Sequence, residues 1–89
     1  MTSYFTKSFK KSYNKRIQSR KNLEDRFEER YDLFVENPNN MILKDHALGG
    51  KMLGYRSFSI TGDIRVVYYV NNDIAYFVDI GTHNQVYVK

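Results

Sequence analysis

The chain contains no cysteine, no tryptophan and only one proline among its 89 residues. Without cysteine it can form neither a disulfide framework nor a thiolate metal site, which fits a reducing compartment. It also has no run of about 18 apolar residues, and no apolar segment of the kind found in signal peptides. These absences predict a soluble protein of the cytoplasm that makes no membrane contact. The length predicts a single domain over residues 1–89.

Acidic residues are absent from the first 23 positions, although that segment carries seven lysines and arginines and the whole chain has a net charge of +4. The next 13 positions hold six of the ten acidic residues. Such a basic segment indicates an anionic partner, either nucleic acid or an acidic protein. A solvated helix face explains the same charge equally well, so charge alone does not name the partner.

The N-terminal third has helical periodicity. Large apolar residues recur every four positions from Phe5 to Ile17, with Thr6 as the expected N-cap. A second apolar stripe runs from Leu23 and ends before Asn37-Pro38, because the residue before proline is pushed out of the α region. These two helices should form an antiparallel hairpin. Ser3 to Phe5 is either a short edge strand or a disordered start.

Three runs rich in β-branched and aromatic residues follow at 54–60, 64–70 and 74–80, separated by the turns Thr-Gly-Asp and Asn-Asn-Asp. This pattern predicts an antiparallel meander. Strict alternation places Asp79 on the same face as Ala75 and Phe77. Met41, Ile42 and Leu43 are expected to form a short apolar anchor before the first strand. The fold class is therefore α+β, with an N-terminal helical hairpin packed on a C-terminal twisted antiparallel β-sheet.

Four polar side chains are expected near strand ends. His46 and His83 should lie in loops, Asp63 in a hairpin turn and Arg65 just after it. If they converge, they could cleave RNA without a metal: one group removes the 2′-hydroxyl proton, another protonates the leaving 5′-oxygen, and a guanidinium stabilises the phosphorane. The alternative is that each is an ordinary loop residue. Two histidines alone make a poor metal site, so neither metal nor cofactor is expected.

A known pattern covers residues 44–87. Lys44-Asp45-His46-Ala47-Leu48, Gly54-Tyr55-Arg56, Asp63, Val66-Val67-Tyr68 and Gly81-Thr82-His83 closely resemble the YafQ branch of the RelE/ParE superfamily, the toxins of bacterial type II toxin–antitoxin pairs. The combined spacing of these motifs is fairly specific for the family, whereas any one motif alone would be weak evidence. The basic N-terminal helices match that family in kind only.

The resemblance implies a RelE-like microbial RNase fold and a ribosome-dependent endoribonuclease that cleaves mRNA. His83 would be the general acid or base, with His46 as proton-transfer partner and Asp63 as an orienting or activating group. Tyr87 could stack on a base. Further contacts with RNA would come from four basic residues: Arg56, Lys7, Lys10 and Lys11. Arg56 is equally suited to a structural ion pair. The implied partners are an antitoxin, the ribosome with its mRNA, and operator DNA through the antitoxin alone.

Three positions depart from the resemblance, because the branch usually has His at Ser59, Trp at Ile64 and Arg at Asp79. Arg65 could replace the missing cation. Two other functions therefore remain open. One is a ParE-like toxin that inhibits DNA gyrase without nuclease activity, and the other is a catalytically weakened member that mainly binds its antitoxin.

Overall fold

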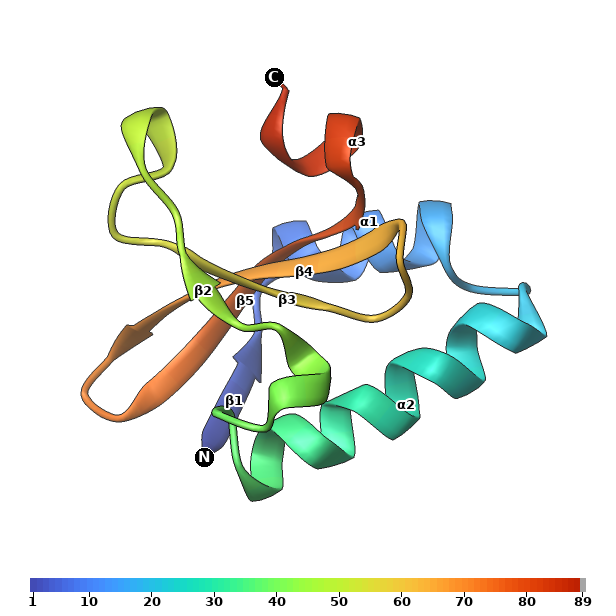
Figure 1. Cartoon of the computed structure of the whole chain (residues 1–89). Coiled ribbons are helices and arrows are strands. Elements are labelled where there is room, and N and C mark those ends of the chain that lie inside the picture. The colour runs from blue at the N-terminus through green and yellow to red at the C-terminus, as the bar shows by residue number, and fades with distance from the viewer. Residues whose placement is uncertain (89) are drawn as a thin grey trace.

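The computed structural model describes residues 1–88 and shows three helices around a twisted five-stranded sheet (Figure 1). The strand order is β1-β5-β4-β3-β2. Helix α2 covers one face of the sheet, and α3 lies on the opposite side (Figure 1). The predicted α+β class is confirmed. None of the helices within residues 1–88 is long and apolar enough to cross a membrane.

Helix α1 (Lys7–Arg16) begins at the predicted N-cap. The Thr6 hydroxyl accepts a hydrogen bond from the Phe9 N–H at 3.2 Å and donates one to the Phe77 carbonyl at 2.7 Å. It therefore both starts the helix and fixes it to the sheet. Helix α2 (Lys21–Glu36) follows after a short turn and ends at Asn37, next to the proline, as expected.

Three strands form the predicted meander: β3 (Arg56–Ser59), β4 (Ile64–Asn71) and β5 (Ile74–Thr82). The turn between β4 and β5 has positive φ at both Asn72 (51°) and Asp73 (64°). A two-residue hairpin loop with two positive φ angles matches the twist of its strands, and Asn and Asp tolerate that backbone better than most residues.

Two further strands extend this meander. The edge strand β1 (Thr2–Phe5) pairs with β5 in parallel, which makes the sheet mixed rather than purely antiparallel. The two-residue strand β2 (His46–Ala47) pairs with β3 at the other edge. Where β1 ends, α1 takes over the exposed edge of β5. The Ser8 hydroxyl donates to the Val78 carbonyl at 2.8 Å, and Arg16 Nη1 donates to the Ile80 carbonyl at 2.9 Å.

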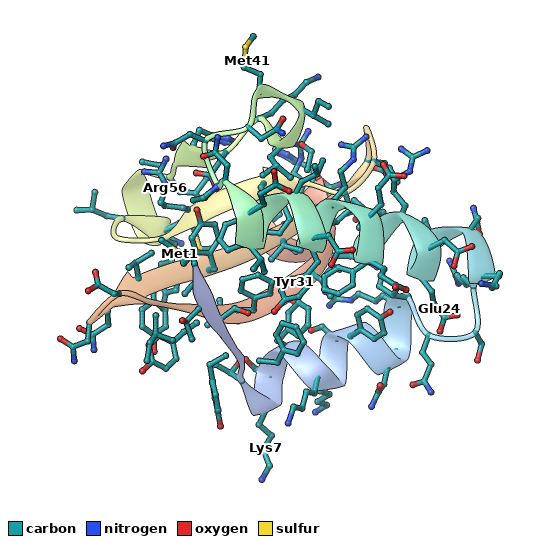
Figure 2. The ribbon with its side chains drawn as sticks, turned by 90° about the horizontal axis from the view of Figure 1, so that it is seen from below. Met1, Lys7, Glu24, Tyr31, Met41 and Arg56 are labelled. Atoms are coloured by element: carbon teal, nitrogen blue, oxygen red, sulfur yellow. The ribbon has the colours of Figure 1, made fainter. Side chains whose placement is uncertain are left out.

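The core is aromatic and lies between the sheet and the two long helices. Phe34 stacks on Phe58 with ring centroids 4.7 Å apart, and Phe77 contacts both rings from β5. Figure 2 shows Tyr31 pointing from α2 into the space between α2 and α1. Such aromatic pairs each contribute about 0.5–1.5 kcal/mol beyond burial.

Only one of the three residues expected to anchor the segment between α2 and the sheet is buried. The segment forms two short 3₁₀ turns, η1 (Met41–Leu43) and η2 (Gly50–Met52), on either side of β2. Leu43 is fully buried, whereas Met41 is 90% exposed and extends away from the molecule (Figure 2). The predicted apolar anchor is therefore wrong for Met41 and for Ile42, which is also exposed.

A β-bulge changes which face of the sheet Asp79 occupies. The register of β4 with β5 shifts between Val67 and Tyr68, so that Val67 pairs with Asp79 while Tyr68 pairs with Phe77. The extra residue in β5 turns Asp79 to the face opposite Phe77, because paired residues share a face. The strict alternation expected for this strand is therefore wrong beyond the bulge.

Candidate active site

One cavity is lined by both histidines. It measures about 450 Å³, and its walls include His46, Lys51, His83 and Tyr87. The residues that line it come from β2, from the loop between β2 and β3, and from α3. Helix α3 and this loop lie on the side of the sheet away from α2 (Figure 1). Both histidines were expected in loops, and this is wrong. His46 belongs to β2, and His83 is the first residue of α3 (His83–Tyr87).

The backbone fixes the proton-bearing nitrogen of His46. Its Nδ1 lies 3.0 Å from the Lys44 carbonyl oxygen. A carbonyl can only accept a hydrogen bond, so this Nδ1 carries the proton and donates it. In the neutral ring Nε2 is then the nitrogen that can take up a proton. This is the arrangement that a general base requires.

Helix α3 places His83 and Tyr87 on the same wall of the cavity. It starts with a capping box in which the Gln85 N–H donates to the Thr82 hydroxyl and the Gln85 side-chain oxygen accepts from the Thr82 N–H. The rings of His83 and Tyr87 meet edge to face at 4.7 Å, and the Tyr87 hydroxyl donates to the Ser57 hydroxyl at 2.5 Å. Residues 82–85, Thr-His-Asn-Gln, match the sequence signature of a capping box, so this helix could have been predicted.

A second cavity of about 370 Å³ borders the first and shares Lys51 and Met52 with it. Across this second cavity lies Arg16 of α1, whose Nη1 forms an ion pair with Asp79 Oδ1 at 3.1 Å. The side chain of Asp79 is 6% exposed and that of Arg16 is 23% exposed. The acid that replaces the family's usual arginine is thus paired with a cation from another element. Neither Arg16 nor Lys51 was a candidate from the sequence.

A side chain at Gly81 would crowd this ion pair. A Cβ atom at this position would lie 2.6 Å from Gln85 Oε1 and 2.8 Å from Arg16 Nη1. Both of those atoms already make hydrogen bonds, to Thr82 and to Asp79 respectively. The glycine therefore lets the guanidinium reach β5 at the base of the helix that carries His83.

Arg65 and Asp63 do not line the cavity of the two histidines. Arg65 donates from Nη1 to the Ser59 hydroxyl at 3.1 Å and lines a separate cavity at the edge of β3. Asp63 is exposed in the turn between β3 and β4, and its N–H donates to the Thr61 hydroxyl. The structure thus brings together three of the expected residues, His46, His83 and Tyr87, and leaves these two outside that cavity.

Arg56 forms a structural ion pair. Its Nε donates to Asp45 Oδ1 at 2.8 Å, and the Tyr68 hydroxyl donates to the other carboxylate oxygen of Asp45. The hydrogen bond that Arg56 donates to Asp45 raises the pKa of Arg56, while burial and the same carboxylate raise the pKa of Tyr68. Asp45 thereby ties the segment before β2 to strands β3 and β4. Of the two roles expected for Arg56, the geometry favours the structural one.

The three lysines expected to contact RNA are exposed along α1: Lys7, Lys10 and Lys11. Figure 2 shows Lys7 extending away from the molecule. Among residues 1–88, no group of three or more His, Cys, Asp or Glu side chains is placed to hold a metal ion. Metal-free chemistry remains a prediction.

Comparison with known proteins identifies the family. The family model described as the bacterial YafQ toxin of type II toxin–antitoxin systems matches residues 1–88. Comparison with curated proteins gives no match. The fold resembles the E. coli DinJ–YafQ toxin–antitoxin complex (TM-score 0.77, 22% identity, covering 96% of this chain and 94% of that one).

Two other solved structures are similar. A YoeB/ParE toxin from Agrobacterium tumefaciens has a TM-score of 0.76 at 22% identity, covering 93% of this chain and 99% of that one. A copper-bound mutant toxin from Helicobacter pylori has a TM-score of 0.73 at 26% identity, covering 98% and 99%. Together with this fold similarity, the match over residues 1–88 leads to one conclusion: the chain belongs to the YafQ family of bacterial type II toxins.

Proposed function

We propose that this toxin is an endoribonuclease that cleaves mRNA on the ribosome by acid–base chemistry without a metal. The observation that supports this most is the single cavity shared by His46 and His83, which are 37 positions apart in the sequence and belong to different elements. Two imidazoles can supply both proton transfers that RNA cleavage needs near neutral pH.

The proposed reaction uses the 2′-hydroxyl of the RNA as nucleophile. His46 removes the 2′-hydroxyl proton through Nε2, and the 2′-oxygen attacks the adjacent phosphorus. The bond from phosphorus to the 5′-oxygen breaks, and His83 gives a proton to that oxygen. The products are a 2′,3′-cyclic phosphate and a 5′-hydroxyl. Lys51, which lines the same cavity, offers a positive charge for the phosphorane.

A cleavage assay on mRNA-programmed ribosomes tests this reaction. His46→Ala and His83→Ala should each reduce the cleavage rate by about 10²–10⁴-fold, the usual contribution of general acid–base catalysis. Asp73→Asn, a change in the hairpin turn between β4 and β5, serves as the matched surface control. Cleavage at the wild-type rate by both histidine variants would overturn the assignment.

The nucleophile is tested separately. An mRNA carrying a 2′-deoxy nucleotide immediately before the cleavage site should resist the toxin, because it has no 2′-hydroxyl. Cleavage of that mRNA would exclude attack by the 2′-oxygen. A DNA gyrase supercoiling assay tests the ParE-like alternative, since inhibition of gyrase with no mRNA cleavage would replace the nuclease proposal.

The proposed partner is an antitoxin, as in the E. coli complex of DinJ with YafQ. An acidic or amphipathic segment that covers the basic surface and blocks the histidine cavity would silence the toxin. Contact with operator DNA would occur through the antitoxin alone. Co-expression with the product of the neighbouring reading frame should restore growth and give a stable complex, and a growth defect that persists would argue against that partner.

A further inference from the structure

A third cavity, at the free edge of β3, is lined by four basic side chains. It measures about 340 Å³ and includes Arg26 and Arg30 of α2, Lys44 and Arg65. Strand β2 pairs with β3 only at Arg56 and Ser57, so the edge beyond that pairing is open. The cavity thus lies where α2, the end of η1 and the turn between β3 and β4 meet.

Hydrogen bonds hold two of these cations, Arg30 and Arg65, in place. Arg26 and Arg30 are four residues apart and therefore project from the same face of α2. Arg30 donates from Nη1 to the Ile42 carbonyl at 3.3 Å, and its side chain is 16% exposed. Arg65 is fixed by its hydrogen bond to Ser59. Lys44 ends η1 in a left-handed conformation, with φ of 53°.

The positive charge of this cavity is largely uncompensated. Within residues 1–88, Arg30 is the one member with a carboxylate inside 4 Å, the 63%-exposed Glu29 at 3.4 Å. No acidic side chain lines the cavity. Like charges spaced four apart on a helix destabilise it. A bound anion would remove that repulsion.

The hydroxyl groups in the cavity are also available as donors. The Ser59 oxygen accepts from Arg65, and the Thr61 oxygen accepts from the N–H groups of Asp63 and Ile64. Each of these hydroxyl groups therefore keeps its own hydrogen to donate. Guanidinium, ammonium and hydroxyl donors around one space select an oxyanion with several acceptor oxygens.

We propose that this cavity binds a phosphate group of an RNA backbone. The RNA identity rests on the proposed nuclease function. Ser57 accepts the hydrogen bond of the Tyr87 hydroxyl. Ser59 lies two residues further along β3, so the two serines are about 7 Å apart. The ligand proposed for this site is a phosphate next to the scissile one, on the RNA strand that enters the histidine cavity. Ribosomal RNA offers the same chemistry.

The test compares two variants that each lose two positive charges. Arg26→Gln/Arg30→Gln removes half of the proposed site, and Arg20→Gln/Lys21→Gln removes the same charge outside this cavity, near the start of α2. Unfolding by urea shows whether each remains folded. Lys44→Gln, a change at an exposed side chain, replaces the first variant if that one is unstable.

Binding is measured by fluorescence anisotropy with a 2′-deoxy-substituted RNA oligonucleotide that cannot be cleaved, between about 50 and 200 mM salt. Arg26→Gln/Arg30→Gln should bind about tenfold more weakly. Its slope of log K against log salt should fall by about 0.7 for each phosphate that the variant no longer neutralises, as for single strands. The control variant should keep the wild-type slope.

Binding to empty ribosomes distinguishes the two RNA sources. Weaker binding confined to the oligonucleotide assigns the cavity to the substrate strand, and weaker binding confined to ribosomes assigns it to ribosomal RNA. Unchanged affinity in both assays would overturn the proposal. A wild-type toxin that binds RNA through this cavity but never cleaves mRNA would overturn the nuclease proposal and leave the phosphate site standing.

Discussion

Arg16 of α1 reaches across the edge of the sheet to Asp79 of β5, with Nη1 3.1 Å from Oδ1. In the resemblance to the YafQ branch, the position of Asp79 usually carries arginine. Here the strand supplies the carboxylate and the helix supplies the guanidinium. A guanidinium therefore still lies beside this strand, in the cavity that borders the histidine cavity, and its charge is paired with Asp79.

Breaking this pair should destabilise the fold. Arg16→Met removes the ion pair of the nearly buried Asp79 carboxylate, which should lower the free energy of unfolding by about 3 kcal/mol. Arg16→Met/Asp79→Asn should recover part of that stability, because the neutral amide can still accept the Ile80 N–H. Urea denaturation of both variants measures the effect, and equal destabilisation of the two would contradict it.

Replacing Tyr87 separates the role of its ring from that of its hydroxyl. Tyr87→Phe keeps the ring and removes the hydrogen bond to Ser57, so RNA affinity should change little. Tyr87→Ala should weaken RNA binding by about 1–3 kcal/mol, the value of one stacked base. Anisotropy with the non-cleavable oligonucleotide measures both. If Tyr87→Phe binds normally but no longer cleaves, the hydroxyl takes part in the chemistry.

Asp63 has a matched control within the chain, because Asp63 and Asp73 are both exposed aspartates in hairpin turns of the same sheet. If Asp63 orients or activates a catalytic group in the bound complex, Asp63→Asn should slow mRNA cleavage at least tenfold. Asp73→Asn should leave the rate unchanged. Identical rates for the two variants on ribosomes would remove Asp63 from the site.

Tyr68 should make stability depend on pH in the alkaline range. Its pKa is raised from the ordinary value of 10.0 by burial and by the hydrogen bond to Asp45. The unfolded chain therefore releases this proton first, and the stabilisation, complete below pH 10, decreases as the pH rises above it. The decrease is at most about 1.4 kcal/mol per pH unit.

Tyr68→Phe isolates this contribution, because both proteins share every other tyrosine. The variant should be less stable than wild type at pH 7 by about 1.5–3 kcal/mol, the usual contribution of a hydrogen bond to a charged group. The difference should shrink above pH 10. Denaturant titrations at several pH values measure it, and a difference that stays constant to pH 11 would contradict the expectation.

Local signals in the sequence were sufficient for most of the fold. Thr6 caps α1 as expected, Asn37-Pro38 ends α2, and Asn72-Asp73 forms the hairpin turn. Each of these depends on residues within a few positions of one another. The face occupied by Asp79 depends instead on a bulge that β4 and β5 form together, and no local pattern in β5 marks it.

The candidate site was predictable only where local motifs mark its residues. The motifs around His46 and His83 pointed to the two residues that the cavity unites. Lys51 was missed because no local motif marks the 3₁₀ turn η2, which the folded chain brings beside α3. Arg26 and Arg30 were missed because their charges look like an ordinary solvated helix face until Lys44 and Arg65 are placed beside them.

The parallel pairing of β1 with β5 governs when the toxin can complete its fold. Thr6, which follows β1 directly, bonds to Phe77, 71 residues further along the chain. During synthesis, the first strand must wait for the last one, and contacts of such long range form slowly. A nascent toxin therefore stays incomplete until β5 has emerged. His83 and Tyr87 come later still, so the histidine cavity cannot assemble on a partly made chain.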